Sequence, residues 1–295
     1  MRVLNYGSLN YDYVYEVDHF VNPGETMTSK SMTRFFGGKG LNQSIALKRA
    51  GADVYHAGMI GMDGKAFLDL LDENEIPTKY LRMVDDMNGH AIIQVSASGE
   101  NCILLYEGAN GKNTVEQMEQ VLKEFEAGDF LLIQNEINGL EDLVKRAYEM
   151  EMKIILNPSP YNERLTEEIL KRVSIFIMNE VEGAQITGKL KPEEILDEMK
   201  HKYPDAAVLL TLGSKGSMYQ DAKGRIQCAS HKVEVVDTTA AGDTYTGYFV
   251  ASIQKGLSVE ESMKFATKAA AIAVTRKGAT PSIPSLQEVD ESIMV

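Results

Sequence analysis

The chain contains no tryptophan and only two cysteines among its 295 residues. Cys102 and Cys228 lie far apart in the sequence, so they form neither a metal-ligand spacing nor a disulfide framework. We therefore expect two free thiols, buried or unreactive, in a reducing compartment.

Positive charge and long apolar runs are scarce as well. The 30 lysine and arginine residues are outnumbered by 43 acidic residues, which gives a formal net charge of -13. Nucleic acids and anionic membranes bind basic patches, so we expect neither as a partner. No stretch approaches the roughly 18 apolar residues of a membrane-spanning helix, and the opening residues MRVLNYGSLN lack the apolar core of a secretory signal. We expect a cytoplasmic protein.

The remaining composition is that of a globular protein, with 44% hydrophobic and 25% charged residues. Strand-like runs alternate with amphipathic helical runs, for example 54–60 with 64–73 and 130–134 with 140–150. This alternation predicts an α/β fold in which right-handed βαβ units build a mostly parallel sheet covered by helices. Ligands bind at the carboxyl ends of such strands. The polar and glycine residues expected there are Asn135, Glu136, Asn157, Asn179, Thr211 and Gly213.

Two segments, 11–36 and 89–106, do not follow the alternation, because they are rich in β-branched and aromatic residues without a helical period. The second segment predicts a hairpin around Ser98-Gly99-Glu100. Together the segments predict a small separate β-sheet. Such a sheet exposes an apolar face and needs a partner, for which a second copy of the chain is the natural candidate.

Residues 237–247, DTTAAGDTYTG, follow an apolar alternating run at 233–236 that predicts the end of a strand, and precede a helical run at 245–253. Small residues leave the N–H groups of a first helical turn uncovered, which makes an anion site. Asp243 lies within this site, where it can accept the proton of a hydroxyl that attacks a phosphoryl group. The alternative is that Asp243 only caps the helix.

Further motifs occur in order along the chain: GSLNYD (7–12), FGGKGLNQ (36–43), IQNE (133–136), NPSP (157–160), NEVE (179–182), TLGSKG (211–216) and AVTRKGATPSIP (273–284). With these motifs the chain resembles the ribokinase family of carbohydrate kinases over essentially its whole length. The resemblance implies a three-layer α/β sandwich with a mostly parallel central sheet, as one kinase domain over 1–295. It also implies that segments 11–36 and 89–106 form a β-sheet lid over the sugar, through which a homodimer assembles.

The resemblance implies ATP-dependent phosphorylation of a sugar hydroxyl, with Asp243 as general base and the N–H groups of Ala241, Gly242 and Asp243 around the phosphoryl group. Asn10 and Asp12 share one face of a strand and suit vicinal hydroxyls, although Asn and Asp also build turns. The sugar-binding residues implied by the resemblance are Asn10, Asp12, Gly38, Lys39, Asn42, Glu136 and Asp243.

The glycines at 37–40 have a competing interpretation, a dinucleotide-binding fingerprint, but the third glycine of that pattern is missing. The resemblance instead implies ATP binding by other segments. Asn179 and Glu182 would organise water around Mg²⁺, and the same pair also fits a helix capping box, a role that can coexist. The nucleotide-binding residues implied by the resemblance are Asn179, Glu182, Thr211, Gly213, Ser214, Lys215, Gly216, Gly242 and Thr267.

For the 273–284 segment the resemblance implies a monovalent-cation site, for which we expect K⁺. Arg276 would contribute only its carbonyl oxygen, because a guanidinium group repels a cation. The alternative is an ordinary basic turn after a helix. The cation ligands implied by the resemblance are Asp237, Thr239, Ala273, Arg276, Gly278 and Ser282.

The expected reaction is transfer of the γ-phosphate of ATP to the primary 5-hydroxyl of D-ribose. Another sugar, such as 2-deoxyribose or a hexose, and a nucleoside remain open as substrates. A sugar-binding regulator without catalysis is the alternative from another functional class. The presence of Asp243 together with Asn179 and Glu182 argues against that alternative.

Overall fold

The computed structural model describes residues 1–292, and its largest element is a nine-stranded sheet. Strands β12 and β13 pair in antiparallel fashion, as do β11 and β12, whereas the pairs among the other strands are parallel. The α/β fold with a mostly parallel sheet is therefore confirmed. In spatial order the strands are β13 (Gly224–Cys228), β12 (Ser217–Asp221), β11 (Ala207–Thr211), β10 (Ile175–Asn179), β9 (Lys153–Asn157), β8 (Phe130–Gln134), β1 (Val3–Tyr6), β4 (Val54–Ile60) and β5 (Tyr80–Met83).

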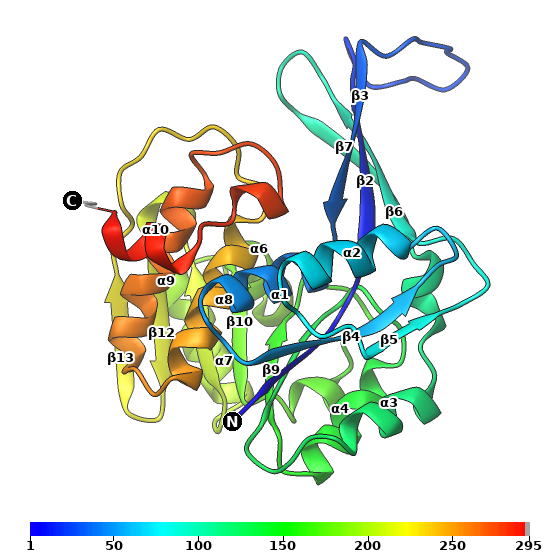
Figure 1. Ribbon diagram of the computed structural model, residues 1–295. Coiled ribbons are helices and arrows are strands. Elements are labelled where there is room, and N and C mark those ends of the chain that lie inside the picture. The colour runs from blue at the N-terminus through cyan, green and yellow to red at the C-terminus, as the bar shows by residue number, and fades with distance from the viewer. Residues whose placement is uncertain (293–295) are drawn as a thin grey trace.

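Helices cover both faces of this sheet (Figure 1). None of the helices within residues 1–292 combines the length and the apolar character that a membrane crossing requires. One face carries α1 (Lys39–Arg49), α2 (Lys65–Glu73), α8 (Ala241–Gln254), α9 (Val259–Ala273) and α10 (Leu286–Glu291). The other carries α3 (Val115–Leu122), α4 (Leu140–Glu149), α5 (Glu167–Leu170), α6 (Glu180–Thr187) and α7 (Pro192–Lys202).

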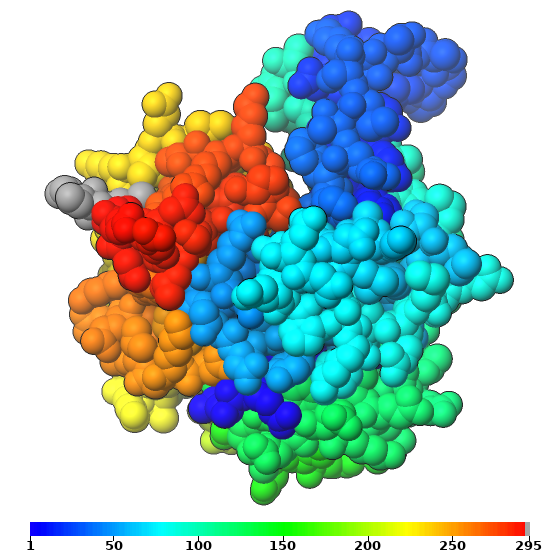
Figure 2. Space-filling model, in the orientation of Figure 1, coloured from blue at the N-terminus to red at the C-terminus, as the bar shows by residue number. Residues whose placement is uncertain are grey.

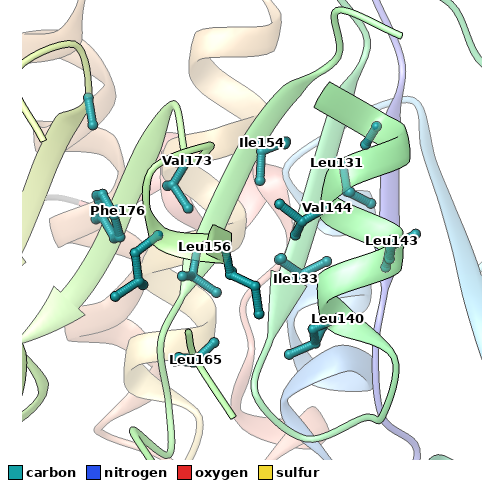
Figure 3. Close-up of a cluster of buried hydrophobic side chains, with 14 of the residues drawn as sticks. Leu131, Ile133, Leu140, Leu143, Val144, Ile154, Leu156, Leu165, Val173 and Phe176 are labelled. Atoms are coloured by element: carbon teal, nitrogen blue, oxygen red, sulfur yellow. The ribbon is translucent and has the colours of Figure 1, made fainter. Parts of the chain in front are cut away.

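The strands build two hydrophobic cores, because successive side chains point to opposite faces. On β8, Leu131 and Ile133 join the core under α4, while Leu132 joins the core under α1 and α8. Figure 3 shows Leu131 and Ile133 facing Leu140 and Val144 of α4. Because these strands are buried on both sides, they appear in the sequence as continuous apolar runs.

A second, four-stranded sheet forms the lid, with β2 (Asn10–Glu16), β3 (Ser31–Gly37), β6 (Gly89–Val95) and β7 (Asn101–Tyr106) in the order β3-β2-β6-β7. The central pair β2–β6 is parallel and the two outer pairs are antiparallel. The β6–β7 hairpin turns where Ser96 N–H donates to Glu100 O over 2.9 Å, around the predicted Ser98-Gly99-Glu100. The lid projects from the body of the molecule in Figures 1 and 2.

Two expectations from the sequence differ from the structure. The strand expected at 233–236 is wrong: Val235 and Val236 are 59% and 51% exposed, and no strand forms there. The helix expected from 245 begins at Ala241, which brings Asp243 into its first turn. Both cysteines are free, as expected, and Cys102 is exposed on β7.

Candidate active site

The site lies at one edge of the large sheet, where the carboxyl ends of the parallel strands meet. Register pairs Gln134 with Asn157 at the ends of β8 and β9, and Asn179 with Thr211 at the ends of β10 and β11. Glu136 follows β8 by two residues. The structure therefore collects at this edge the polar residues that the sequence places at strand ends.

Asp243 is buried in the first turn of α8, with 7% of its surface exposed. Its Oδ2 accepts a hydrogen bond from Asn42 Nδ2 over 2.9 Å, and its Oδ1 accepts one from Gln43 Nε2 over 2.8 Å. The N-cap of α8 is Ala240, in the left-handed region at φ 59°, and no side chain caps this helix. The structure therefore does not show the capping role that was the alternative for Asp243.

Backbone donors surround the space in front of this carboxylate. Among residues 1–292, the N–H groups of Gly242 and Asp243 have no hydrogen-bond acceptor, whereas the N–H of Ala241 donates to Thr238 O over 3.2 Å. A side chain at Gly242 would meet open space, since no atom lies within 4 Å of a Cβ built there. Two free N–H groups at the positive end of a helix dipole form an anion cradle. Ala241 is part of the backbone of this cradle, but its N–H group is not free because it donates to Thr238 O.

Lys39 is the first residue of α1 and follows the N-cap Gly38, whose φ of 91° favours glycine. Burial alone would lower the pKa of Lys39, but the carboxylates of Asp243, Glu136 and Glu182 outweigh burial and raise it. Lys39 is therefore a cation placed among the acids of the site.

Glu136 accepts hydrogen bonds from the Ser8 hydroxyl and, over 2.9 Å, from the backbone N–H of Lys39. Burial raises the pKa of Glu136, and Lys39 and Ser8 only partly oppose this. A pocket of about 250 Å³ lies beside Glu136 and is closed on one side by Leu105 of the lid. Glu136 is the one expected sugar-binding residue in the lining of this pocket, and its carboxylate can accept hydrogen bonds from hydroxyl groups.

Asn10 and Asp12 lie on the first lid strand, β2. Asn10 Oδ1 accepts from Asn110 Nδ2 over 2.7 Å, which leaves the Nδ2 of Asn10 as the donor for a ligand. Burial, together with the charges of Glu136 and Asp243, raises the pKa of Asp12 to about 7.

Two neighbours explain how Asp12 is accommodated on this face of the lid. A Cβ at Gly37 would lie 2.0 Å from Asp12 Oδ2, so only glycine leaves room there. Tyr11 points away from Asp12, because its hydroxyl donates to Asp63 O over 2.9 Å and its ring packs against Phe67 at 4.5 Å between centroids. The Tyr11 side chain therefore packs on the face of the lid opposite to that of Asp12.

The segments that the resemblance assigns to the nucleotide are the start of α6, the turn after β11, and α9. Asn179 and Glu182 form a capping box: Asn179 Oδ1 accepts from the Glu182 N–H over 3.0 Å, and Glu182 Oε2 accepts from the Asn179 N–H over 2.8 Å. Glu182 Oε1 is left for water or a hydrated cation. Because Asn179 and Thr211 pair in register, this carboxylate and the turn that follows β11 share one side of the site.

That turn is the short helix η2 (Gly213–Lys215), closed where the N–H of Leu212 donates to Gly216 O over 2.8 Å. Gly213 and Gly216 have φ values of 56° and 97°, which favour glycine. The side chain of Ser214 lies on the same turn, and Lys215 Nζ lies 3.9 Å from Glu180 Oε1. Thr267 of α9 is buried, with its Oγ1 3.6 Å from Cys228 Sγ.

The expected cation ligands come from two segments that are joined by hydrogen bonds. Asp237 Oδ2 accepts from the Gly278 N–H and its Oδ1 from the Thr239 N–H, each over 2.9 Å. Burial would raise the pKa of Asp237, but these donors hold it below the usual value. The guanidinium of Arg276 turns away to Glu288 Oε1 at 2.6 Å.

The remaining expected cation ligands are Ala273, the last residue of α9, and Ser282, the last residue of η3 (Thr280–Ser282). Ser282 is fully buried and its hydroxyl donates to Ala279 O over 2.7 Å, while Ala273 O accepts the Arg276 N–H over 3.1 Å. The set that remains is a carboxylate with hydroxyl and carbonyl oxygens, which suits a hard monovalent cation. Within residues 1–292 no group of three or more His, Cys, Asp or Glu side chains could hold a metal ion.

Sequence reasoning missed two residues that support this site. Gln43 lies inside the FGGKGLNQ motif, so its position carried a signal, but its bond to Asp243 connects residues 200 positions apart. Asn110 holds both Asn10 and the Leu9 N–H, and nothing in its local sequence indicates that role.

Comparisons with known proteins show which family the chain resembles. A model of the pfkB family carbohydrate kinases matches residues 2–286. The ribokinase of Haemophilus influenzae is 37% identical, over 97% of this chain and 96% of that protein. The ribokinase structure from Thermotoga maritima superposes with a TM-score of 0.88 at 31% identity, covering 98% of both chains. The structure of Arabidopsis thaliana ribokinase complexed with ribose and ATP does so with a TM-score of 0.88 at 30% identity, covering 98% of this chain and 97% of that one. With a family model and full-length relatives in agreement, the chain belongs to the pfkB family of carbohydrate kinases.

Proposed function

We propose that this carbohydrate kinase transfers the γ-phosphate of ATP to the 5-hydroxyl of D-ribose. The observation that carries the proposal is the buried carboxylate of Asp243 next to the free N–H groups of Gly242 and Asp243 at the start of α8. Support for ribose comes from the similar ribokinases, one of which has a structure with ribose and ATP.

In this mechanism Asp243 accepts the proton of the attacking hydroxyl while the oxygen of that hydroxyl forms the new bond to the γ-phosphorus. The bond between that phosphorus and the bridging oxygen of ATP breaks, and ADP leaves with the electron pair. The N–H groups of Gly242 and Asp243 stabilise the charge on the transferring group, and the Lys39 ammonium faces the same space. The lid excludes water, which would otherwise take the place of the sugar as nucleophile.

Mg²⁺ would be held near Glu182 through water, because Glu182 keeps one oxygen outside its capping box. The chemistry that Mg²⁺ supplies when bound is neutralisation of phosphate charge. The chain itself contributes the orientation of Glu182, which the Asn179 N–H fixes. The turn at Gly213–Lys215 would hold the nucleotide, with Thr267 behind it.

The lid would also hold two copies of the chain together. The face of the lid that carries Asp12 continues as Val14, and register places Ile93 and Ile103 beside it. Ile103 is 54% exposed, so this apolar strip is uncovered in one chain. A homodimer that packs lid against lid would bury it.

The cysteines bear on the compartment of this single-domain enzyme. Both are free thiols and one of them is exposed, which fits the reducing cytoplasm.

A panel of acceptors tests the proposed substrate. With ATP and Mg²⁺ present, we expect ADP release to be fastest, measured as kcat/KM, with D-ribose, because Asn10, Asp12 and Glu136 can pair several hydroxyls at once. A site built for hydroxyls discriminates against analogues that lack them, since its own buried groups lose their partners.

The other outcomes of the panel separate the alternatives. If D-ribose is inert while a hexose or a nucleoside is phosphorylated rapidly, the assignment of ribose is wrong and the phosphotransfer remains. If a sugar binds in calorimetry and no acceptor releases ADP, the protein is a sugar-binding regulator. Mass spectrometry of the product identifies the phosphorylated position.

Replacing K⁺ by tetramethylammonium at constant ionic strength should lower kcat. The reason is that Asp237 and Thr239 join the 276–278 turn directly behind the start of α8, so a cation between these segments would order the anion cradle. The measurement is the initial rate at saturating D-ribose and ATP as a function of K⁺ concentration. A rate that does not change with K⁺ would mean that 276–278 is an ordinary basic turn.

A further inference from the structure

Gln43 is the second residue that holds the carboxylate of Asp243, and it is completely buried. Its Nε2 donates to Asp243 Oδ1 over 2.8 Å and to Asn157 Oδ1 over 3.1 Å. Because none of its surface is exposed, Gln43 cannot touch a sugar or a nucleotide. An effect of Gln43 on the reaction must therefore act through the residues that it bonds, and of these Asp243 is the proposed base.

The direction of the Gln43 amide is set from one side by Asn157. Asn157 Nδ2 donates to the carbonyl of Ile177 over 2.8 Å, and a backbone carbonyl can only accept. This contact assigns the oxygen of Asn157 to the side that faces Gln43. The group that Gln43 presents there must then be its NH₂.

A second chain of contacts sets the same direction from the opposite side. Asn5 Nδ2 donates to the carbonyl of Gly40 over 2.7 Å, so Asn5 Oδ1 faces Gln134 and accepts from its Nε2 over 2.9 Å. The same Nε2 donates to Gln43 Oε1 over 2.7 Å. Two backbone carbonyls, reached through different side chains, thus orient the amide of Gln43 with its NH₂ toward Asp243.

We propose that Gln43 is a positioning residue that holds the carboxylate of Asp243 in the plane in which it accepts the proton of the attacking hydroxyl. Two neighbouring residues of α1 each donate one hydrogen bond to this carboxylate, Asn42 to Oδ2 and Gln43 to Oδ1. We call these two hydrogen bonds the clamps on Asp243. Each of these two amide groups is a donor with no acceptor capacity at that atom, so both oxygens of the Asp243 carboxyl group act as acceptors. The inference rests on the proposed role of Asp243 as general base.

Gln43→Met, which keeps the length of the side chain and removes the donor, tests this role. We expect kcat to fall roughly 10- to 100-fold, because a misplaced catalytic group slows the reaction by such factors. KM for D-ribose should change less than about threefold, since Gln43 does not touch the sugar. In the Asp243→Asn background, the added Gln43→Met change should alter kcat by less than about threefold, because no carboxylate is left to position.

A matched control is Gln220→Met, a buried glutamine on β12 that donates to Leu196 O over 3.0 Å, away from the site. This variant should keep kcat and report the general effect of removing a buried amide together with its bonds to Leu196 and Arg225. Equal losses of kcat from Gln43→Met in the wild-type and Asp243→Asn backgrounds would overturn the proposal. Normal kcat in Asp243→Asn itself would instead overturn the general-base assignment.

If Gln43→Met does not fold, as judged by circular dichroism and thermal melting, Gln134→Met takes its place. That variant keeps Gln43 but removes the donor to its Oε1. We expect kcat to fall roughly three- to tenfold in the wild-type background and to stay unchanged in the Asp243→Asn background. An equal fold-reduction in kcat in the wild-type and Asp243→Asn backgrounds would contradict the proposal.

Discussion

Asp243→Asn should lower kcat by roughly 10²- to 10⁴-fold, because it removes the general base and keeps the shape of the side chain. The variant should still fold and bind ATP, since the free N–H groups of Gly242 and residue 243 belong to the backbone. One clamp is lost: the asparagine amide would oppose either Asn42 Nδ2 or Gln43 Nε2 with a donor against a donor. The measurements are kcat with D-ribose, and ATP affinity by calorimetry.

The control for this prediction is Asp129→Asn at the opposite end of β8. Asp129 is buried and paired with Arg2, with Oδ2 2.7 Å from the guanidinium Nη2. Its loss should lower the free energy of unfolding without lowering kcat. Turnover by Asp243→Asn close to that of the wild type would remove Asp243 from the role of base and leave the anion cradle as the main source of catalysis.

Much of the fold could be predicted from the sequence, because buried parallel strands and amphipathic helices leave clear apolar periods. The run at 233–236 shows where this reasoning ends. The apolar residues Val233, Val235 and Val236 fit the pattern of a strand, but β13, which ends at Cys228, is the edge strand of the sheet, and the run does not pair with it. Whether an alternating run pairs with another strand depends on the tertiary structure, which cannot be derived from the periodicity of the sequence.

A feature of the candidate site could be predicted where all the residues that form it lie within one short sequence motif. The capping box of Asn179 and Glu182 needs only three residues of spacing, and the structure forms it. The clamp on Asp243 joins α1 to α8, and the contact between Asn110 and Asn10 joins residues 100 positions apart. The left-handed Ala240 also escapes prediction, since nothing in a run of small residues marks one of them for positive φ.

Asp12→Asn should have two effects of opposite sign, on catalysis and on stability. We expect kcat/KM for D-ribose to fall by about 1.5 to 3 kcal/mol of transition-state stabilisation, the usual contribution of a hydrogen bond to a charged group. We also expect the unliganded variant to be more stable than the wild type at pH 8. The reason is that Asp12, Glu136 and Asp243 are acids gathered in a partly buried site that Lys39 alone does not neutralise.

The sign of the stability effect follows from the pKa of Asp12, which rises from its ordinary value of 3.8 to about 7 in the folded chain. Between these values the folded state binds more protons than the unfolded state, so ionisation of Asp12 destabilises the fold progressively as pH rises toward 7. Removing the charge should therefore raise the free energy of unfolding at pH 8 by about 2 to 4 kcal/mol, and by less than half of that at pH 5. Urea denaturation of both proteins at the two pH values measures the difference.

Asp129→Asn provides the control of opposite sign for the stability effect of Asp12→Asn. Arg2 holds the pKa of Asp129 below its usual value despite burial, so the loss of this carboxylate should destabilise the fold at pH 8. A gain for Asp12→Asn that is equal at both pH values would show that ionisation of Asp12 does not strain the unliganded site. In that case the Asp12→Asn change would act only through the lost hydrogen bond between Asp12 and the sugar.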